Sequence, residues 1–195
     1  MGNVNDTSVV KELKTQIGIL GTLLGIIWGV HIVNMLLFSG RLQQFGIMPR
    51  SLIGLRGIVL APLLHGSFGH LVANTLPLLT LGWLTLLRGK REFWITTALV
   101  MLAAGLGTWV FGTPYSIHIG ASGIIFGYFG FLALRGYFER SVSAIALSLL
   151  VGILYGSLIW GVLPGSLGVS WESHLFGFLG GAFAAKLLSR SQKVG

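Results

Sequence analysis

Two polar residues in apolar stretches of the chain, Ser122 and His174, have side chains that could serve as a nucleophile and its base. Ser122 stands in the Gly-Ala-Ser-Gly segment 120–123, and His174 is followed by Gly177 and Gly181. A serine hydroxyl is a poor nucleophile without a base, and histidine can accept and return its proton near neutral pH. If their helices approach one another, this pair could attack a carbonyl group.

The spacing of glycines around both residues predicts such an approach. Along the stretch that contains Ser122, glycines recur at intervals of three, four and three, at Gly120, Gly123, Gly127 and Gly130. His174, Gly177 and Gly181 share one helical face, and small residues let membrane helices pack closely. We expect the two glycine faces to meet and to place Ser122 within hydrogen-bonding range of His174. A serine among small residues is by itself a weak signal, because such serines are common in membrane helices.

His70 and Asn74 form a second polar pair, one helical turn apart. At this spacing both side chains project from the same face. One interpretation is a pair of donors that stabilises negative charge developing on a substrate oxygen, an effect that is strongest in a preorganised site of low dielectric constant. The alternative is a polar contact that only holds two helices together.

A catalytic triad would need a third group that orients the histidine, commonly a carboxylate. The single aspartate, Asp6, lies in the N-terminal segment, and Glu172 would point away from His174 on a helix. We expect Glu172 to be a solvated carboxylate at the membrane interface. The predicted chemistry is therefore a Ser-His dyad. Phe126, one turn after Ser122, could hold the imidazole by stacking, or it could be an ordinary core aromatic residue.

The remaining candidates, His65 and His118, are expected in loops, His65 with the task of bonding loop carbonyls. A metal site made of His65, His70 and His118 is conceivable, but neither an HExxH spacing nor a carboxylate ligand accompanies it. Cysteine is absent, which excludes disulfides and thiolate chemistry. We expect no metal and no organic cofactor.

The elements that must position these residues are membrane helices. Of the 195 residues 53% are hydrophobic and 9% are charged, and the mean hydropathy is +0.84, too apolar for a water-soluble globule. Six apolar runs predict an all-α bundle of six transmembrane helices, at residues 17–38, 70–87, 93–112, 119–134, 142–162 and 173–188. A single domain is expected over 1–195, with a short cytoplasmic N-terminal segment at 1–16 and a cytoplasmic tail at 189–195.

The net charge of +8 follows from the expected topology rather than from nucleic-acid binding. With the N-terminus inside, the cytoplasmic segments hold ten of the thirteen basic residues, namely Lys11, Lys14, Arg88, Lys90, Arg91, Arg135, Arg140, Lys186, Arg190 and Lys193. The outer loops at 113–118 and 163–172 contain none. This bias predicts that both termini are cytoplasmic and that the partner of the protein is the lipid bilayer.

The long first loop, residues 39–69, mixes apolar stretches with arginines, glycines and prolines. It is too broken for a span and too apolar for an ordinary loop, so we expect helices that lie partly embedded at the membrane interface. The segment 163–172, rich in glycine, is expected to form a flexible lid over the site.

Taken together, these motifs resemble those of the rhomboid family of intramembrane serine proteases. Segment 120–123 is similar to its GxSG motif, segment 174–181 to its HxxGxxxG motif, and segment 65–74 to its HxxxxHxxxN pattern. The resemblance implies a Ser122 nucleophile, a His174 base, and an oxyanion site made of His70, Asn74 and the Ser122 amide. It also implies that the first-loop helices lie partly in the outer leaflet, and that a substrate helix enters laterally near the second and fifth spans.

One position departs from the family pattern. Many members carry Trp-Arg before the second helix, whereas Leu55-Arg56 stands here. Arg56 is still expected to anchor the first loop by bonding carbonyls.

The expected function is cleavage of transmembrane proteins through an acyl-enzyme, in a bacterial inner membrane, with the active site open to the extracytoplasmic side. The alternatives are an inactive rhomboid-like protein that binds membrane clients, and a small transporter or channel. The spans lack the mid-membrane carboxylates that a transporter would predict.

Overall fold

The computed structural model describes residues 3–165 and 168–191, and most of the chain in these ranges is helical. The elements are α1 (Asn3–Phe38), η1 (Arg41–Phe45), η2 (Leu52–Arg56), α2 (Gly57–Leu60), η3 (Ala61–Leu63), α3 (Phe68–Leu86), α4 (Lys90–Phe111), α5 (Ser122–Glu139), α6 (Val142–Tyr155), η4 (Gly156–Val162) and α7 (Trp171–Ser191). Among the described residues, β-type pairing is limited to one isolated antiparallel bridge, between Ile47 and His118.

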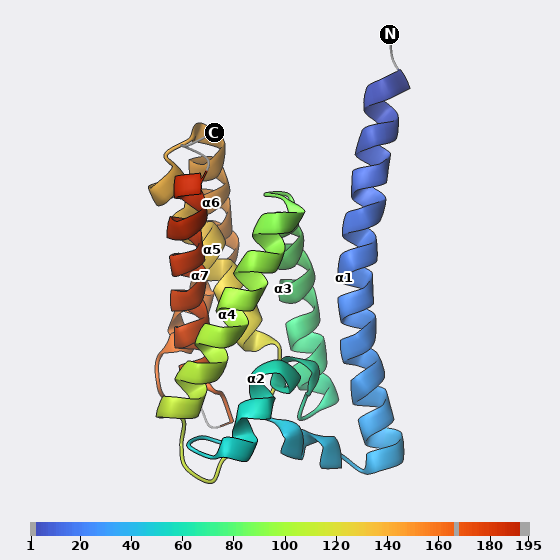
Figure 1. The fold of residues 1–195 in the computed structure, drawn as a ribbon, viewed down its shortest axis with the longest axis vertical. Coiled ribbons are helices and arrows are strands. Elements are labelled where there is room, and N and C mark those ends of the chain that lie inside the picture. Colours follow the sequence, from blue (N-terminus) through green and yellow to red (C-terminus); the bar gives the residue numbers. More distant parts are fainter. Residues whose placement is uncertain (1–2, 166–167, 192–195) are drawn as a thin grey trace.

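Each of the six predicted apolar runs is occupied by a long helix, and successive long helices run in opposite directions (Figure 1). α1 begins at Asn3, so most of the expected N-terminal segment is a continuation of the first helix. Residues 1–2 and 192–195 of the two expected tails lie outside the described ranges. α1 starts, and α7 ends, at the same end of the molecule (Figure 1).

Not all six helices are long and apolar enough to count as membrane spans by themselves. In the described ranges, Ser8–Phe38, Lys90–Phe111 and Val142–Val162 meet this test, and a fourth span results if Leu52–Leu63 and Phe68–Leu86, bent by 71°, are taken together. α5 and α7 are less apolar because they carry glycines and charged residues. α5 is mostly buried by the other helices, so it does not need an apolar surface around its whole circumference. α7 packs on α4 and α5 and exposes Leu179, Phe183 and Leu187.

α5 and α7 make the most extensive helix contact of the fold. A Cβ atom at Gly177 or Gly181 of α7 would overlap the carbonyl oxygens of Gly123 and Gly127 of α5. A Cβ atom at Gly130 of α5 would in turn overlap Phe178 O of α7, so glycine is required on both helices for this backbone approach. The predicted meeting of the two glycine faces is present in the structure.

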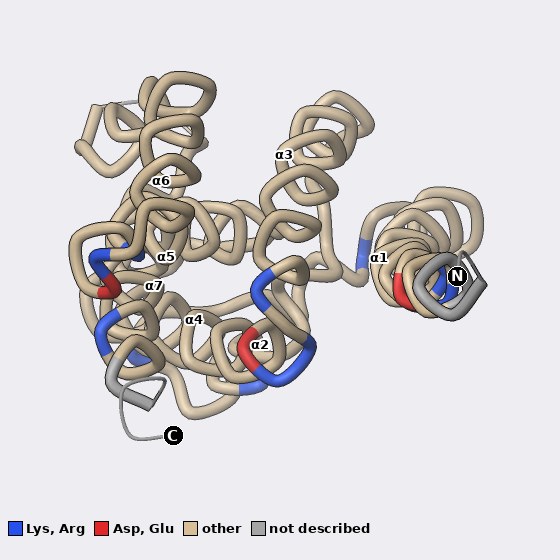
Figure 2. The backbone as a smooth tube through the Cα atoms, turned by 90° about the horizontal axis from the view of Figure 1, so that it is seen from above, with Lys and Arg blue, Asp and Glu red and all other residues tan. Residues whose placement is uncertain are grey.

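α1 lies at the edge of the bundle, against α3 (Figures 1 and 2). Trp28 of α1 donates from Nε1 to Thr75 Oγ1 over 3.1 Å, and Trp83 of α3 donates to Gln16 Oε1 over 2.9 Å. These two bonds join α1 and α3 at two levels along their axes, which fixes the register of one helix against the other.

Charged side chains tie α3, α4 and α5 together at the end of the bundle where α1 starts. Arg135 is fully buried and pairs with Glu92 at 3.1 Å and with Glu139 at 2.6 Å. Arg88 adds a second pair to Glu139 at 2.6 Å. Each carboxylate and guanidinium therefore has a partner of opposite charge at a place where an isolated charge would be expensive.

Replacing Arg135 by alanine is expected to destabilise the fold by about 3–5 kcal/mol, because the buried carboxylate of Glu92 loses the guanidinium that pairs with it and Glu139 keeps Arg88 alone of its two arginines. Thermal unfolding in detergent would measure the loss. Arg91→Ala is the matched control, since Arg91 is an exposed arginine on α4. Equal melting temperatures for the two variants would contradict a role for the buried network.

Candidate active site

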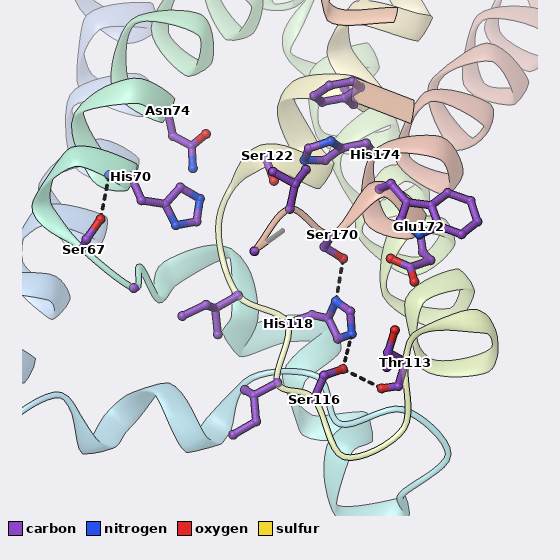
Figure 3. Close-up of a pocket in the computed structure, with 17 residues that line it drawn as sticks. Ser67, His70, Asn74, Thr113, Ser116, His118, Ser122, Ser170, Glu172 and His174 are labelled. Carbon is purple, nitrogen blue, oxygen red and sulfur yellow. Dashed lines mark hydrogen bonds between the residues drawn. The ribbon is translucent and has the colours of Figure 1, made fainter. Parts of the chain in front are cut away.

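A pocket of about 980 Å³ opens at the opposite end of the bundle, where α5 and α7 begin. Ser122, Phe126 and His174 line it from these two helices, and His70 and Asn74 line it from α3 (Figure 3). The pocket therefore brings together, from three helices, the residues that the sequence predicted for a nucleophile, a base and an oxyanion site.

Gly120 places Ser122 at the first turn of α5. Its backbone has a φ of 120°, a conformation that favours glycine, and its amide donates to Ala61 O over 2.9 Å. A Cβ atom here would lie 2.7 Å from Cε1 and 2.8 Å from Nε2 of His70. Gly120 was predicted to belong to the stripe that packs on the His174 helix, and this is wrong: it precedes α5 and faces α3, where it leaves room beside His70 and Asn74.

His174 is buried and held on two sides. Its ring stacks on Phe126, with centroids 3.9 Å apart and planes inclined by 7°. Its Nδ1 lies 2.9 Å from Gly161 O, and because a carbonyl oxygen only accepts, Nδ1 must carry the proton. In the neutral ring this leaves the lone pair on Nε2.

Ser122 and His174 face one another across the pocket (Figure 3). Both residues lie in the described ranges, and no hydrogen bond joins the Ser122 hydroxyl to the His174 ring. Catalytic hydrogen bonds are often long or poorly aligned in a free enzyme and tighten when substrate binds. The arrangement therefore places a serine hydroxyl and a neutral imidazole with a free Nε2 lone pair in one pocket.

His70 and Asn74 are positioned by the start of α3. Ser67 caps the helix by accepting from the His70 amide over 3.1 Å. Asn74 is buried, and its Nδ2 lies 3.1 Å from His65 Nε2. An amide nitrogen only donates, so His65 Nε2 accepts and the Asn74 side chain is fixed by a histidine that is 1% exposed.

The sequence profile of the rhomboid domain matches residues 54–191. The chain belongs to the rhomboid family. It is 42% identical over 180 residues to an uncharacterized protein of Mycobacterium tuberculosis, covering 88% of this chain and 75% of the relative. It is 36% identical over 203 residues to an uncharacterized protein of Mycobacterium leprae, covering 99% and 80%. RHOMBOID-like protein 4 of Arabidopsis thaliana is 34% identical over 128 residues, which are 60% of this chain and 30% of the plant protein.

The first loop of this rhomboid is joined to the pocket-lining His118 by backbone bonds and is held internally by Arg56. Ile47 and His118 exchange two backbone hydrogen bonds of 2.9 Å. Arg56 donates from Nη2 to Gln44 O over 3.1 Å, and its guanidinium lies 4.4 Å from the centre of the Phe45 ring. The prediction that Arg56 anchors this loop through a carbonyl is confirmed.

Glu172 differs from its prediction. It was expected to be solvated, but it is 3% exposed and lines the pocket next to the start of α7. With Glu172, five residues of the predicted lid at 163–172 line the pocket, the others being Gly168, Val169, Ser170 and Trp171. Residues 166–167 of that lid lie outside the described ranges.

Sequence reasoning missed two groups that hold the site together. One is the carbonyl of Gly161 in η4, which fixes the His174 tautomer. A backbone carbonyl has no residue-specific signal in a sequence, so this partner could not have been found. The other is Ser170, which bonds His118 at 2.7 Å. Its position four residues before His174 was the one available signal.

The ring of His118 is bonded to hydroxyl groups on both sides. Both of its ring nitrogens lie 2.7 Å from serine hydroxyls, those of Ser116 and Ser170. Within residues 3–165 and 168–191, no group of three or more His, Cys, Asp or Glu side chains is arranged to hold a metal ion.

Proposed function

We propose that this rhomboid is an intramembrane serine endopeptidase with Ser122 as nucleophile and His174 as base. The observation that carries the proposal is the double restraint of His174 by the Phe126 ring and the Gly161 carbonyl. It holds a neutral imidazole, with its free Nε2 lone pair, in the pocket that Ser122 lines. Packing and one backbone carbonyl take the place of the aspartate of a triad.

In the proposed reaction, Ser122 Oγ attacks the carbonyl carbon of a substrate peptide bond while His174 Nε2 takes the hydroxyl proton. The resulting oxyanion accepts hydrogen bonds from His70, Asn74 and the Ser122 amide. His174 then protonates the leaving amine, which gives an acyl-enzyme. Water in the pocket attacks the ester by the same route in reverse, releasing the acid and restoring Ser122.

The topology that fits this reaction has six spans, both termini in the cytoplasm and the pocket open to the extracytoplasmic side of a bacterial inner membrane. The distribution of charge supports it. Arg88, Lys90, Arg91, Arg135 and Arg140 lie at the end of the bundle opposite the pocket, and Figure 2 views the molecule from that end. A basic excess of this kind marks the cytoplasmic side.

The substrates are proposed to be transmembrane proteins, whose helices would reach the pocket from the lipid between α3 and α6. α6 offers an exposed apolar surface there. Among the described residues, one side-chain hydrogen bond joins α6 to α3, between Thr80 and Tyr155. Two helices joined so sparsely can separate more easily than α5 and α7, whose backbones touch.

The second candidate function is that of an inactive rhomboid-like protein that binds membrane clients in the same pocket. The missing hydrogen bond between Ser122 and His174 favours it. A fluorophosphonate probe distinguishes the two functions, because an activated serine displaces fluoride from phosphorus and becomes covalently labelled.

The expected result is labelling of the purified protein at Ser122, with no label on Ser122→Ala and much slower labelling of His174→Ala. Mass spectrometry of the labelled peptide identifies the site. Ser157→Ala, at an exposed serine outside the pocket, is the control and is expected to label like the parent. A parent protein that binds clients but remains unlabelled would establish the second function.

A further inference from the structure

A chain of hydrogen bonds crosses the mouth of the pocket beside the dyad. Ser170, just before α7, lies 2.7 Å from His118 Nδ1, and Ser116 lies 2.7 Å from His118 Nε2. Ser116 also donates its hydroxyl hydrogen to Thr113 O. Figure 3 shows the chain as dashed lines that run from the start of α7 to the loop between α4 and α5.

The donor and the acceptor of every hydrogen bond in this series follow from its last acceptor, the carbonyl oxygen of Thr113. Thr113 O can only accept, so the hydrogen of Ser116 is used there and Ser116 Oγ must accept from His118 Nε2–H. In the neutral ring His118 Nδ1 is then unprotonated and accepts from the Ser170 hydroxyl. The chain exists in this form only while His118 is neutral.

His118 and Ser170 stand at equivalent sequence positions relative to the two residues of the dyad. His118 stands four residues before Ser122, and Ser170 stands four residues before His174. Ser170 O also accepts from the His174 amide over 3.2 Å, which is the first backbone bond of α7. His118 is in turn held by its two backbone bonds to Ile47 of the first loop.

We propose that His118 and Ser170 form a positioning pair that sets the distance between the first turns of α5 and α7, and thereby the distance between Ser122 and His174. The inference rests on the proposed function. The glycine contacts fix how closely the two helices approach, and the backbone bonds of His118 to Ile47 and of Gly120 to Ala61 hold the segment before α5. The segment before α7 is then the freer of the two to shift. The His118–Ser170 bond removes that freedom at the height of the dyad.

Burial keeps His118 in the form that the chain requires. It lowers the pKa of His118 below its ordinary value, and the carboxylate of Glu172 opposes this in part. The other charged or titratable groups around it are His70 and His174 across the pocket, and Arg50 of the first loop, which donates to Gly112 O over 2.7 Å. On acidification, protonation of Nδ1 ends its ability to accept from Ser170.

The test compares Ser170→Ala, which removes the donor, with Ser170→Thr, which keeps a hydroxyl. For Ser170→Ala we expect kcat on a transmembrane substrate to fall by roughly ten- to a hundredfold, because displacements of about 1 Å have effects of that size. KM and the melting temperature should change little, and Ser170→Thr should retain most of the parent rate. His118→Gln, which offers an acceptor and a donor, should lose less than His118→Phe.

The pH dependence separates positioning from a general weakening of the fold. The ratio of parent kcat to Ser170→Ala kcat should be largest at neutral pH and should approach one as the pH falls through the pKa of His118, because the parent then loses the same bond. Titration of His174 affects both proteins and cancels in the ratio. A ratio independent of pH, an unchanged kcat, or a faster Ser170→Ala would each overturn the proposal.

Failure of this inference can be told apart from failure of the proposed function. A parent that neither cleaves nor labels refutes the protease assignment itself. The His118 bond can be measured even then, from the ¹⁵N chemical shifts of its ring in detergent micelles. Those shifts should show an Nε2–H tautomer in the parent, and any other tautomer would overturn the inferred bond direction.

Discussion

Ser122→Ala and His174→Ala are each expected to reduce cleavage of a transmembrane substrate by about 10⁶-fold, the size of the loss seen in a serine protease when the nucleophile or its histidine base is removed. Without the hydroxyl no acyl-enzyme can form. Without the imidazole the hydroxyl proton has no acceptor, since Glu172 and His118 belong to the neighbouring wall of the pocket. The measurement is initial rate in detergent and in liposomes with a labelled substrate.

Because the two residues act as a unit, the double variant should be no slower than the single ones. Ser157→Ala and His31→Gln serve as controls, since neither residue lines the pocket. Full cleavage by Ser122→Ala or by His174→Ala would refute the proposed dyad. Both variants should keep the melting temperature of the parent protein, and the change in side-chain volume is small for Ser122→Ala.

His70→Ala and Asn74→Ala form the second prediction, with an expected loss of roughly ten- to a thousandfold each. Hydrogen bonds to the oxyanion form as charge develops, so kcat and kcat/KM should fall together while KM stays nearly constant. Asn74 is fixed by His65, so His65→Ala should reproduce part of the Asn74→Ala loss.

Val72→Ala is the control for this series, because Val72 is exposed on the same helix and does not line the pocket. If His70→Ala and Asn74→Ala both cleave at the parent rate, the pair returns to the alternative interpretation of a polar contact between helices. A rise in KM with unchanged kcat would instead assign the two residues to substrate binding.

Several parts of the fold and site could be predicted because their signals are periodic in the sequence. The runs of apolar residues located all six long helices, since a membrane helix must be apolar over most of its length. Their ends were less certain: α1 starts at Asn3 rather than near residue 17, because charged residues can continue a helix beyond the membrane. The paired glycine spacings correctly indicated that α5 and α7 would touch.

Other features depend on backbone atoms and on burial, which leave little trace in residue types. Gly120 looked like one more member of a glycine stripe, yet its φ of 120° turns it toward α3. Glu172 looked like a surface carboxylate, yet the segments around the pocket bury it. Its environment is created by loops whose conformation the sequence pattern does not specify.

The sequence by itself determined that this is a membrane protein with a serine, two histidines and an asparagine on three helices that could converge. These properties follow from residue type and helical period alone. The tertiary structure decided how the base is held, through the Gly161 carbonyl and the Phe126 ring, and how the starts of α5 and α7 are joined, through His118 and Ser170. Such contacts join segments distant in the chain, and their geometry exists only once the helices have packed.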